Sequence, residues 1–462
     1  MNRLISFLIL CLFSMPQLNA QVIIKGKLGN LPGEISKIAV DYWLEDRWHE
    51  LDIIQLTPEK TFQKRISGKY GQTRLRLWGQ PTRWLDFIFP QNPATDSVID
   101  FGNIDYAYIN ANPANLRGGE NEAYYSLLTA NKKYRLQRDS LSQSDSLPGA
   151  TKERLKTNME TARSFMNARC REISANHKGT ITGDIVAKLL YVPEKSDFPD
   201  EKDISKLTQT DFERDYLLDL LPVNDSRVLF HNGLIRALNV YTSKFCETDS
   251  SNYINTIMGI RKGNEKVDTW LFKYLLQTLV NYKDDNGLTY LLKWYSNGCS
   301  MEELNKDQST SILLTSLKNC ETGKKAYNLS LPDINGINTS LSGLAAKSKL
   351  TLLLFWRTDC SHCLEFEPEL EDLYKKYASA GLEVIGISMD QDESTWKKYL
   401  AAHPAKWPNL RPNLMDQRVQ LITHYPVPGT PALIAVDKNF IVKNRMVIRN
   451  NIEDYIKEAL TR

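Results

Sequence analysis

The stretch Lys349-Leu350-Thr351-Leu352-Leu353-Leu354-Phe355-Trp356-Arg357-Thr358-Asp359-Cys360-Ser361-His362-Cys363 decides the fold of the C-terminal part of this chain. Its first half is an apolar, strand-like run, and its end opens a helix-like run with two cysteines three residues apart. Two thiols at this spacing can close a small ring and pass electrons to another dithiol. A bare Cys-x-x-Cys also serves as half of a zinc site, so the flanking strand and helix make the redox interpretation the stronger one.

The length and composition are those of an ordinary globular protein with several domains. The chain has 462 residues, of which 42% are hydrophobic and 24% are charged, and this length favours about three domains. The formal net charge is +3. A balance this close to neutral gives no indication of nucleic-acid binding.

Residues 1–20 have the pattern of a secretory signal peptide. Arg3 lies near the start, an apolar stretch runs from Leu4 to Phe13, and Leu18-Asn19-Ala20 fits a cleavage site. The apolar stretch is too short to span a bilayer, and no later segment of the sequence is a better candidate. We therefore expect a cleaved signal peptide, a periplasmic or otherwise exported chain, and no transmembrane segment beyond the signal peptide.

Of the 7 cysteines, Cys11 falls within the predicted signal peptide and the others follow it. Export to an oxidising compartment permits disulfides among them. Cys299 and Cys320 flank a short helical stretch and are candidates for a pair. Buried free thiols are the alternative, and the sequence leaves both interpretations open.

Residues 21–117 are predicted to form an N-terminal antiparallel β domain of unknown function. Short β-like runs alternate with breakers such as Pro32-Gly33, as in sandwich or barrel-like domains. The runs are Val22–Gly26, Ile38–Trp43, Leu75–Trp78 and Leu85–Pro90. Trp43, Trp48 and Trp78 would form either an aromatic ligand surface or, as tryptophan more often does, part of the core.

Residues 118–322 are predicted to form a central α-helical domain. Apolar residues recur at helical spacing in several segments, namely Tyr124–Leu128, Lys152–Ile173, Phe212–Leu221 and Trp270–Leu276. No repeat of fixed period is present, so an irregular bundle is favoured over a solenoid. His177 and His231 have no carboxylate or cysteine at ligand spacing, so we expect surface or core positions for both.

Residues 323–462 are predicted to form a C-terminal α/β domain with a central sheet, because strand-like and helix-like runs alternate along them. The expected strands are Leu350–Phe355, Leu382–Ser388, Ala432–Val436 and Ile441–Ile448. The expected helices are Cys360–Tyr377, Glu393–Ala402, Asp416–His424 and Ile452–Leu460.

The position of Cys360 at the start of a predicted helix determines its expected role. Unpaired N–H groups and the helix dipole stabilise an anion there, which favours a nucleophilic Cys360 thiolate. Cys363, one turn further and less accessible, would resolve the mixed disulfide. His362 can favour the thiolate through charge or a hydrogen bond, or it is an exposed spacer. Asp359 would oppose the thiolate unless solvent screens its charge.

The sequence from Phe355 to Cys363, together with Pro368 and Gly429-Thr430-Pro431, resembles the TlpA-like branch of the thioredoxin superfamily. The resemblance covers residues 323–462. It implies that Trp356 packs beside the disulfide and that Pro368 kinks the active-site helix.

The same resemblance implies a thioredoxin-like fold in which Pro431 follows a cis peptide bond. The backbone of Thr430 would face the dithiol and pair with an extended substrate. Ser361 and His362 would form the dipeptide that tunes the redox couple.

The chain departs from the family at two carboxylate positions. The buried aspartate of thioredoxin, two residues before the tryptophan, is Leu354 here. The glutamate that many TlpA-like proteins carry three residues after the second cysteine is Phe366. Glu365 and Glu367 flank that position, and we expect both to point elsewhere on the helix. Proton transfer at Cys363 is thus left without an assigned residue.

The resemblance and the leader together imply a periplasmic oxidoreductase that exchanges disulfides with protein thiols. Cys360 would attack and Cys363 would resolve, with no cofactor or metal beyond their own disulfide. A membrane electron donor is needed only if the protein reduces its substrates. Zinc is disfavoured because no second cysteine pair lies nearby, and covalent haem because Leu364 rather than histidine follows Cys363.

Two other functions fit parts of the sequence. A thiol peroxidase on the same fold would need Pro-x-x-x-Thr-x-x-Cys, but Arg357 stands three residues before Cys360. A ligand- or partner-binding module with a vestigial redox domain would place the function in the first two domains.

Overall fold

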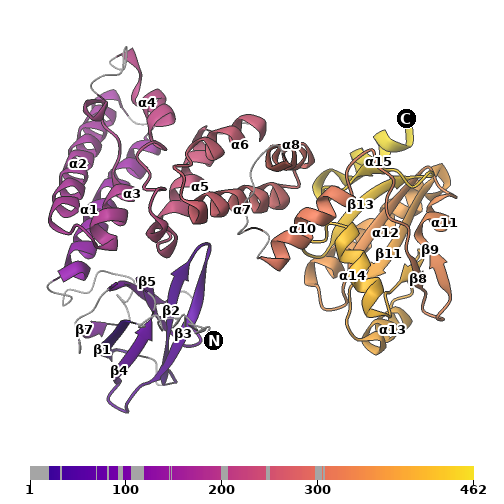
Figure 1. Cartoon of the computed structure of the whole chain (residues 1–462), viewed down its shortest axis with the longest axis horizontal. Helices are drawn as coiled ribbons and strands as arrows, with labels where there is room; N and C mark the ends of the chain where they lie inside the picture. Colours follow the sequence, from indigo (N-terminus) through magenta and orange to yellow (C-terminus); the bar gives the residue numbers. More distant parts are fainter. Residues whose placement is uncertain are drawn as a thin grey trace, which may run out of the picture. The chain divides into compact units, whose positions relative to one another are not determined.

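The structure is a computed structural model, and it describes residues 20–31, 34–68, 70–80, 83–91, 97–105, 119–144, 146, 148–198, 206–245, 250–296, 304 and 307–461. The chain divides into two compact units, which are described separately (Figure 1). Unit 1 comprises Met1–Glu247 and Ile260–Val267, and unit 2 comprises Thr248–Gly259 and Asp268–Arg462. The domain limits proposed from the sequence stay predictions.

Unit 1 begins with a β-sandwich. One sheet has the strand order β4-β1-β7 and the other has the order β3-β2-β5-β6. The strands are β1 (Ala20–Gly29), β2 (Lys37–Leu44), β3 (Arg47–Gln55), β4 (Thr61–Gly68), β5 (Gly71–Leu77), β6 (Trp84–Phe89) and β7 (Val98–Asp105). The pairs are antiparallel apart from β1 and β7, which run parallel. The predicted N-terminal β domain is confirmed.

The two sheets pack face to face on an apolar core. Alternate side chains of β7 enter this core, as the two-residue period of a strand requires, whereas β2 and β5 of the four-stranded sheet are buried along most of their length. Core members without exposed surface are Val22, Ile24, Val40, Leu77, Phe87 and Phe101. Trp43 is buried and contacts Trp48 edge to face, with ring centroids 5.4 Å apart, whereas Trp78 is exposed. The core interpretation therefore holds for Trp43 but not for Trp78.

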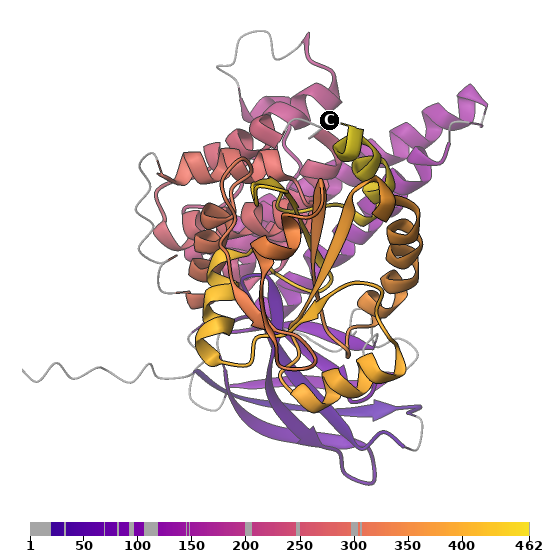
Figure 2. The ribbon, with the colours of Figure 1, turned by 90° about the vertical axis from the view of Figure 1, so that its right-hand side faces the viewer.

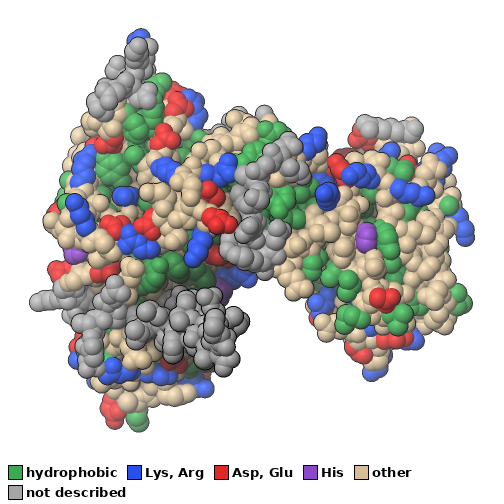
Figure 3. All heavy atoms as spheres, viewed as in Figure 1, with side chains coloured by type: hydrophobic (Ala, Val, Ile, Leu, Met, Phe, Trp, Pro, Cys, Tyr) green, Lys and Arg blue, Asp and Glu red, His purple; other side chains and the backbone are tan. Residues whose placement is uncertain are grey.

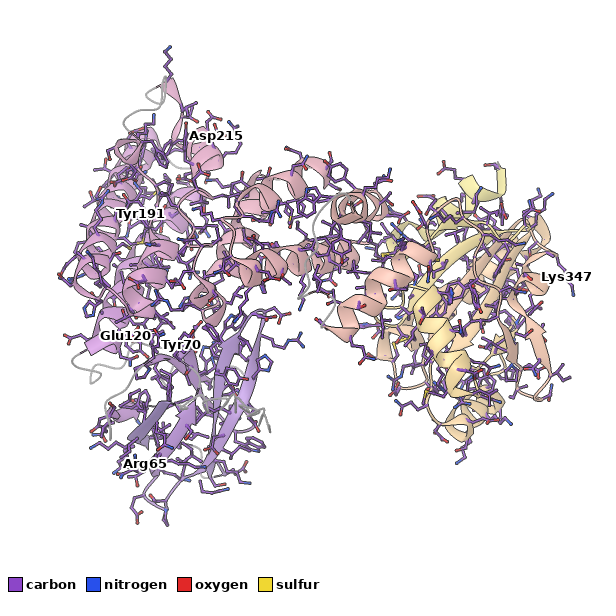
Figure 4. The ribbon with its side chains drawn as sticks, viewed as in Figure 1. Arg65, Tyr70, Glu120, Tyr191, Asp215 and Lys347 are labelled. Atoms are coloured by element: carbon purple, nitrogen blue, oxygen red, sulfur yellow. A yellow bond between two sulfur atoms is a disulfide. The ribbon has the colours of Figure 1, made fainter. Side chains whose placement is uncertain are left out.

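Five α-helices in the described part of unit 1 follow the sandwich in the chain. They are α1 (Gly119–Ser142), α2 (Gly149–Asn176), α3 (Ala187–Leu190), α4 (Gln209–Tyr216) and α5 (Gly233–Phe245). Of these, α1 contacts β6 of the four-stranded sheet. The Asn121 side chain binds both backbone groups of Ile88 in β6, as a neighbouring strand would. It accepts from the Ile88 N–H at 2.8 Å and donates to the Ile88 carbonyl at 3.0 Å. Figure 4 shows Tyr70 and Glu120 at this junction of strands and helices.

Gly71 lies where the sheet approaches the helical part of unit 1. Its φ is +125°, and a Cβ there would stand 2.6 Å from the carbonyl oxygen of Phe230.

We expect Gly71→Ala to lower the free energy of unfolding by about 2–4 kcal/mol, through backbone strain and overlap with Phe230. Urea unfolding followed by circular dichroism measures the loss. Gly79→Ala is the control, since Gly79 also has a positive φ but open space around it; equal losses in both variants would contradict the packing described.

His231 is a buried core histidine of unit 1, which is one of the two positions expected for it. Its Nδ1 accepts the Gly233 N–H at 3.0 Å, and its Nε2 has no hydrogen-bond partner in the described part of the chain. Burial, followed by the charge of Arg236, lowers the pKa of His231 to about 3.

This burial predicts an acid-sensitive unit 1. Unfolded histidine titrates near pH ~6.5, so below that pH the unfolded state binds the additional proton and stability falls as the pH decreases. We expect His231 to account for a loss of about 2 kcal/mol between about pH 6.5 and about pH 5. His231→Asn keeps an acceptor for the Gly233 N–H and should flatten this slope in chemical unfolding. Identical slopes for the variant and the natural protein would rule out a neutral, buried His231.

Unit 2 begins with helices that are joined to the α/β fold by a buried ion pair. The helices are α6 (Ser250–Gly259), α7 (Glu265–Tyr282, from Asp268 onward in unit 2), α8 (Asp285–Ser296) and α10 (Gln308–Asn319). Arg445 has a fully buried side chain that pairs with Asp285 of α8. Its guanidinium also donates to the Leu317 carbonyl at 2.6 Å and to the Thr289 hydroxyl at 2.8 Å. These bonds compensate the cation for its lost water.

The rest of unit 2 is an α/β layer with the strand order β12-β11-β10-β13-β14 (Figures 1 and 2). The strands are β10 (Leu350–Trp356), β11 (Leu382–Ser388), β12 (Asn409–Leu410), β13 (Ala432–Asp437) and β14 (Val442–Asn444), preceded by a hairpin of β8 (Ser330–Pro332) and β9 (Asn338–Ser340). The helices are α11 (Leu341–Ala345), α12 (Ser361–Tyr377), α13 (Glu393–Ala402), α14 (Met415–His424) and α15 (Ile452–Thr461). β10 and β11 pair in parallel, and β13 runs antiparallel to both β10 and β14.

Both faces of this sheet are covered, because alternate residues of β10 enter two different cores. Leu353 and Phe355 pack with Leu421 of α14 on one face. Leu352 and Leu354 pack with Phe366 of α12 on the other. The start of α12 is thereby fixed at the carboxyl end of the central strand.

The predicted multidomain fold is confirmed, with one strand too long. The expected strand Ile441–Ile448 ends at Asn444 as β14. Regular pairing ends there because the Met446 N–H bonds to the Asn444 side chain at 2.8 Å instead of to a strand, although the Val447 N–H still donates to the Leu433 carbonyl of β13 at 3.1 Å.

None of the described helices is long and apolar enough to cross a membrane. On the face shown in Figure 3, acidic and basic side chains are interspersed over both units.

Candidate active site at the Cys360 and Cys363 pair

Cys360 and Cys363 lie where β10 ends and α12 begins, and they form a disulfide. Cys360 is the N-cap of α12, and the Cys363 N–H donates to the Cys360 sulfur at 3.3 Å. That N–H and the helix dipole would stabilise a Cys360 thiolate after reduction. Cys360 is half-buried, whereas Cys363 is only 5% exposed. The outer sulfur is thus the one that an incoming partner can reach.

The loop before β13 lies against Cys360. The Thr430–Pro431 peptide bond is cis, and the Thr430 carbonyl oxygen lies 3.3 Å from the Cys360 sulfur. The structure therefore brings Thr430 and Pro431 together with the cysteine that precedes them by about seventy residues in the chain.

Asp390 fixes the turn that leads to Cys360. Its carboxylate accepts the Thr358 N–H at 3.1 Å, the Thr358 hydroxyl at 2.8 Å and the Ser388 hydroxyl at 2.8 Å. Arg411 and Arg418 donate to the carbonyl oxygen of Asp390. Sequence reasoning gave Asp390 no role in the site. The available signal was its position just after a buried strand, at the sheet edge where α/β proteins build their sites.

Trp356 lies behind the disulfide and is 6% exposed. Its Nε1 donates to the Asn409 side chain at 3.1 Å, and its ring lies 5.4 Å from that of Tyr399. These contacts set the orientation of the indole, which forms a wall next to Cys363.

A cavity of about 10 Å³ lies beside Cys363. Its lining residues are Leu354, Trp356, Cys363, Phe366, Glu367, Trp407 and Asn409. The expectation that Glu367 points away from the site is wrong, because a residue four positions after Cys363 stands one turn further on the same helix face. Glu365 does face elsewhere, since its exposed carboxylate lies 3.5 Å from His362.

Glu367 has a partner on a different helix. The Tyr399 hydroxyl of α13 donates to Glu367 at 2.5 Å. Burial, followed by this hydrogen bond, raises the pKa of Tyr399. Neither the bond nor the shared cavity could be inferred from spacing in the sequence.

The dipeptide and its surroundings are exposed. Ser361, His362 and Pro368 all face solvent, with Pro368 inside α12. Asp359 is paired with Arg357 at 2.6 Å, so its charge is partly offset next to Cys360.

The other described cysteines are buried thiols. Cys170 and Cys320 are free, and burial raises the pKa of each to about 12. Cys299 lies outside the described residues, so its pairing with Cys320 stays a prediction. Within the described ranges, no group of three or more His, Cys, Asp or Glu side chains is arranged to hold a metal ion.

Fold and site together define the class of this protein. Residues 348–442 match a family model described as thioredoxin-like. The C-terminal part of the chain is therefore a thioredoxin-like domain that carries a Cys-x-x-Cys disulfide, and its curated relatives are named thiol-disulfide oxidoreductases.

Its relatives include thiol-disulfide oxidoreductases named ResA. The ResA of Bacillus cereus is 28% identical over 141 residues, which cover 30% of this chain and 78% of the relative. The ResA of Bacillus subtilis is 26% identical over 115 residues, which cover 25% of this chain and 61% of the relative. Among solved structures, a thioredoxin-like protein from Bacteroides caccae is 19% identical with a TM-score of 0.43, covering 54% of this chain and 92% of that one. A thiol:disulfide interchange protein from Bacteroides sp. is 24% identical with a TM-score of 0.29, covering 31% and 93%.

The geometry predicts selective alkylation of Cys360. After gentle reduction we expect Cys360 to react with iodoacetamide at least about 10-fold faster than Cys363, Cys170 or Cys320, because thiolate character and access control the rate. Peptide mapping by mass spectrometry assigns each label. Cys360→Ser serves as the control and should lack the fast phase. Equal labelling of Cys363 would show that the inner sulfur is not shielded.

Proposed function

We propose that this protein is exported to the periplasm and exchanges disulfides with protein substrates through Cys360-Ser361-His362-Cys363. One observation carries the proposal, namely the contrast between a half-exposed Cys360 next to the Thr430 carbonyl and a buried Cys363. This contrast supports attack by the outer sulfur and resolution by the inner one.

In the reducing direction the exchange takes two steps. The Cys360 thiolate attacks a substrate disulfide, so that a bond forms between Cys360 and one substrate sulfur while the other leaves as a thiolate. The deprotonated Cys363 then attacks the Cys360 sulfur, which closes the Cys360–Cys363 disulfide and releases the second substrate thiolate. Two electrons pass from the dithiol to the substrate. The reverse sequence oxidises a substrate dithiol.

The residues around the pair have supporting roles in this proposal. The backbone of Thr430 would pair with an extended substrate segment, and Pro431 would shape the groove beside Cys360. Trp356 would shield the inner sulfur, and Ser361 and His362 would tune the couple from the exposed side. Pro368 would set the course of α12.

The electron partner would set the direction of the exchange. Net reduction of substrates requires a donor that delivers electrons across the membrane, whereas oxidation requires only an oxidised thiol pool. The signal-like residues 1–20 support export. We place the exchange in residues 323–462 and assign no chemistry to residues 21–117 or 118–322.

Cys363→Ser tests protein-directed exchange. Without the resolving thiol, Cys360 should remain bound to its substrates, and reducible adducts should appear on non-reducing gels of cell extracts. The matched control carries Cys360→Ser as well and should show none. A folded Cys363→Ser protein without adducts would refute the proposal.

A further inference from the structure

Cys363 has an environment that opposes its own reaction. The thiol must lose its proton before it can attack the mixed disulfide. Burial disfavours the thiolate, and Leu354, Phe366 and Trp407 line the cavity next to the sulfur. Because Cys363 is only 5% exposed, a proton acceptor at this cavity would speed the loss of its proton.

Glu367 is the only carboxylate among the described residues that line this cavity. On the other walls, the Trp356 Nε1 donates to the Asn409 side-chain oxygen, and the Asn409 amide donates to the Trp407 carbonyl at 3.3 Å. Glu367 stands one helical turn after Cys363, so the helix itself keeps the two side chains on one face.

The Glu367 carboxylate is held by an independent contact from α13. The Tyr399 hydroxyl donates to one carboxylate oxygen at 2.5 Å. The Tyr399 ring in turn packs on Trp356 at 5.4 Å and on His403 at 4.5 Å between centroids. This leaves the second Glu367 oxygen free of any described hydrogen bond to the protein and able to accept a proton.

We propose that Glu367 accepts the proton of Cys363 in the resolving step and that Tyr399 is its positioning residue; the proposal rests on the exchange reaction proposed above. The proton passes from the Cys363 sulfur to Glu367 directly or through one water, since a cavity of about 10 Å³ is near the size that a single water needs. The Cys363 thiolate then forms the bond to the Cys360 sulfur, the bond from Cys360 to the substrate sulfur breaks, and the departing thiolate takes a proton from Glu367 or from solvent. In the reverse direction Glu367 returns the proton to Cys363.

The experiment measures the attack by Cys360 and the resolution by Cys363 as two separate rates. It uses an aromatic disulfide reagent that releases a coloured thiolate in each step. The reduced full-length protein releases one coloured thiolate when Cys360 attacks and a second when Cys363 resolves. We expect Glu367→Gln to slow the second phase about 10- to 100-fold near neutral pH, with the first phase unchanged. The difference should shrink toward about pH 9, where hydroxide deprotonates the thiol without help.

Control variants make the outcome specific. Glu369→Gln removes the same charge from an exposed position of α12, where Glu369 pairs with Arg449, and should leave both phases unchanged. Tyr399→Phe should slow only the second phase and shift its pH profile, and Glu367→Asp should restore part of the rate. An unchanged second phase in folded Glu367→Gln from about pH 6 to about pH 9 would overturn the proposal.

The reagent is small, so this readout does not depend on protein substrates. Absence of adducts with Cys363→Ser in cells, together with the expected pH effect of Glu367→Gln, would refute only the proposed protein-directed function. Adducts in cells without any effect of Glu367→Gln would refute only the role of Glu367.

Discussion

The carboxylate of Asp390 is the constraint on which the redox site depends. It gathers the Thr358 N–H and hydroxyl and the Ser388 hydroxyl, and so ties the end of β11 to the turn after β10. These bonds hold the turn from which α12 starts, with Cys360 as its N-cap and the Cys363 N–H directed at the Cys360 sulfur. Two arginines that bind the Asp390 carbonyl hold the loop from the other side. The position of the Cys360 sulfur is therefore set by residues at the ends of β10 and β11.

The inner sulfur lies in a different electrostatic setting from the outer one. The strand position two residues before Trp356 carries Leu354, which is apolar, so the sheet supplies no carboxylate next to Cys363. A carboxylate reaches the same cavity from the helix instead, through Glu367 and its bond to Tyr399. Leu354 of β10 and Glu367 of α12 line the same cavity, so a carboxylate on the helix lies where the strand provides none.

Much of the C-terminal domain could be predicted from the sequence, because its central strands are continuous apolar runs. β10 and β11 are buried on both faces, and such runs have few alternative structures. β3, β4 and β7 were not predicted, since charged and polar residues interrupt them and only the opposite sheet completes their core. The cysteines, Trp356, Thr430 and Pro431 were found through motif spacing. Glu367 was misjudged and Tyr399 was missed, because their contact joins residues 32 apart in the chain and depends on how α13 packs.

Arg445, just after β14, is a fully buried cation at one edge of the α/β layer. A cation with no exposed side-chain surface is balanced by Asp285 and by groups of α8 and α10, all of which precede residue 323. The Asn319 side chain adds a bond to the Thr423 carbonyl of α14. A chain severed just before residue 323 would strip this guanidinium of its counterion and uncover the helix face that α10 protects. The α/β layer is thus completed by α8 and α10, which lie before it in the chain and supply the groups that bind Arg445.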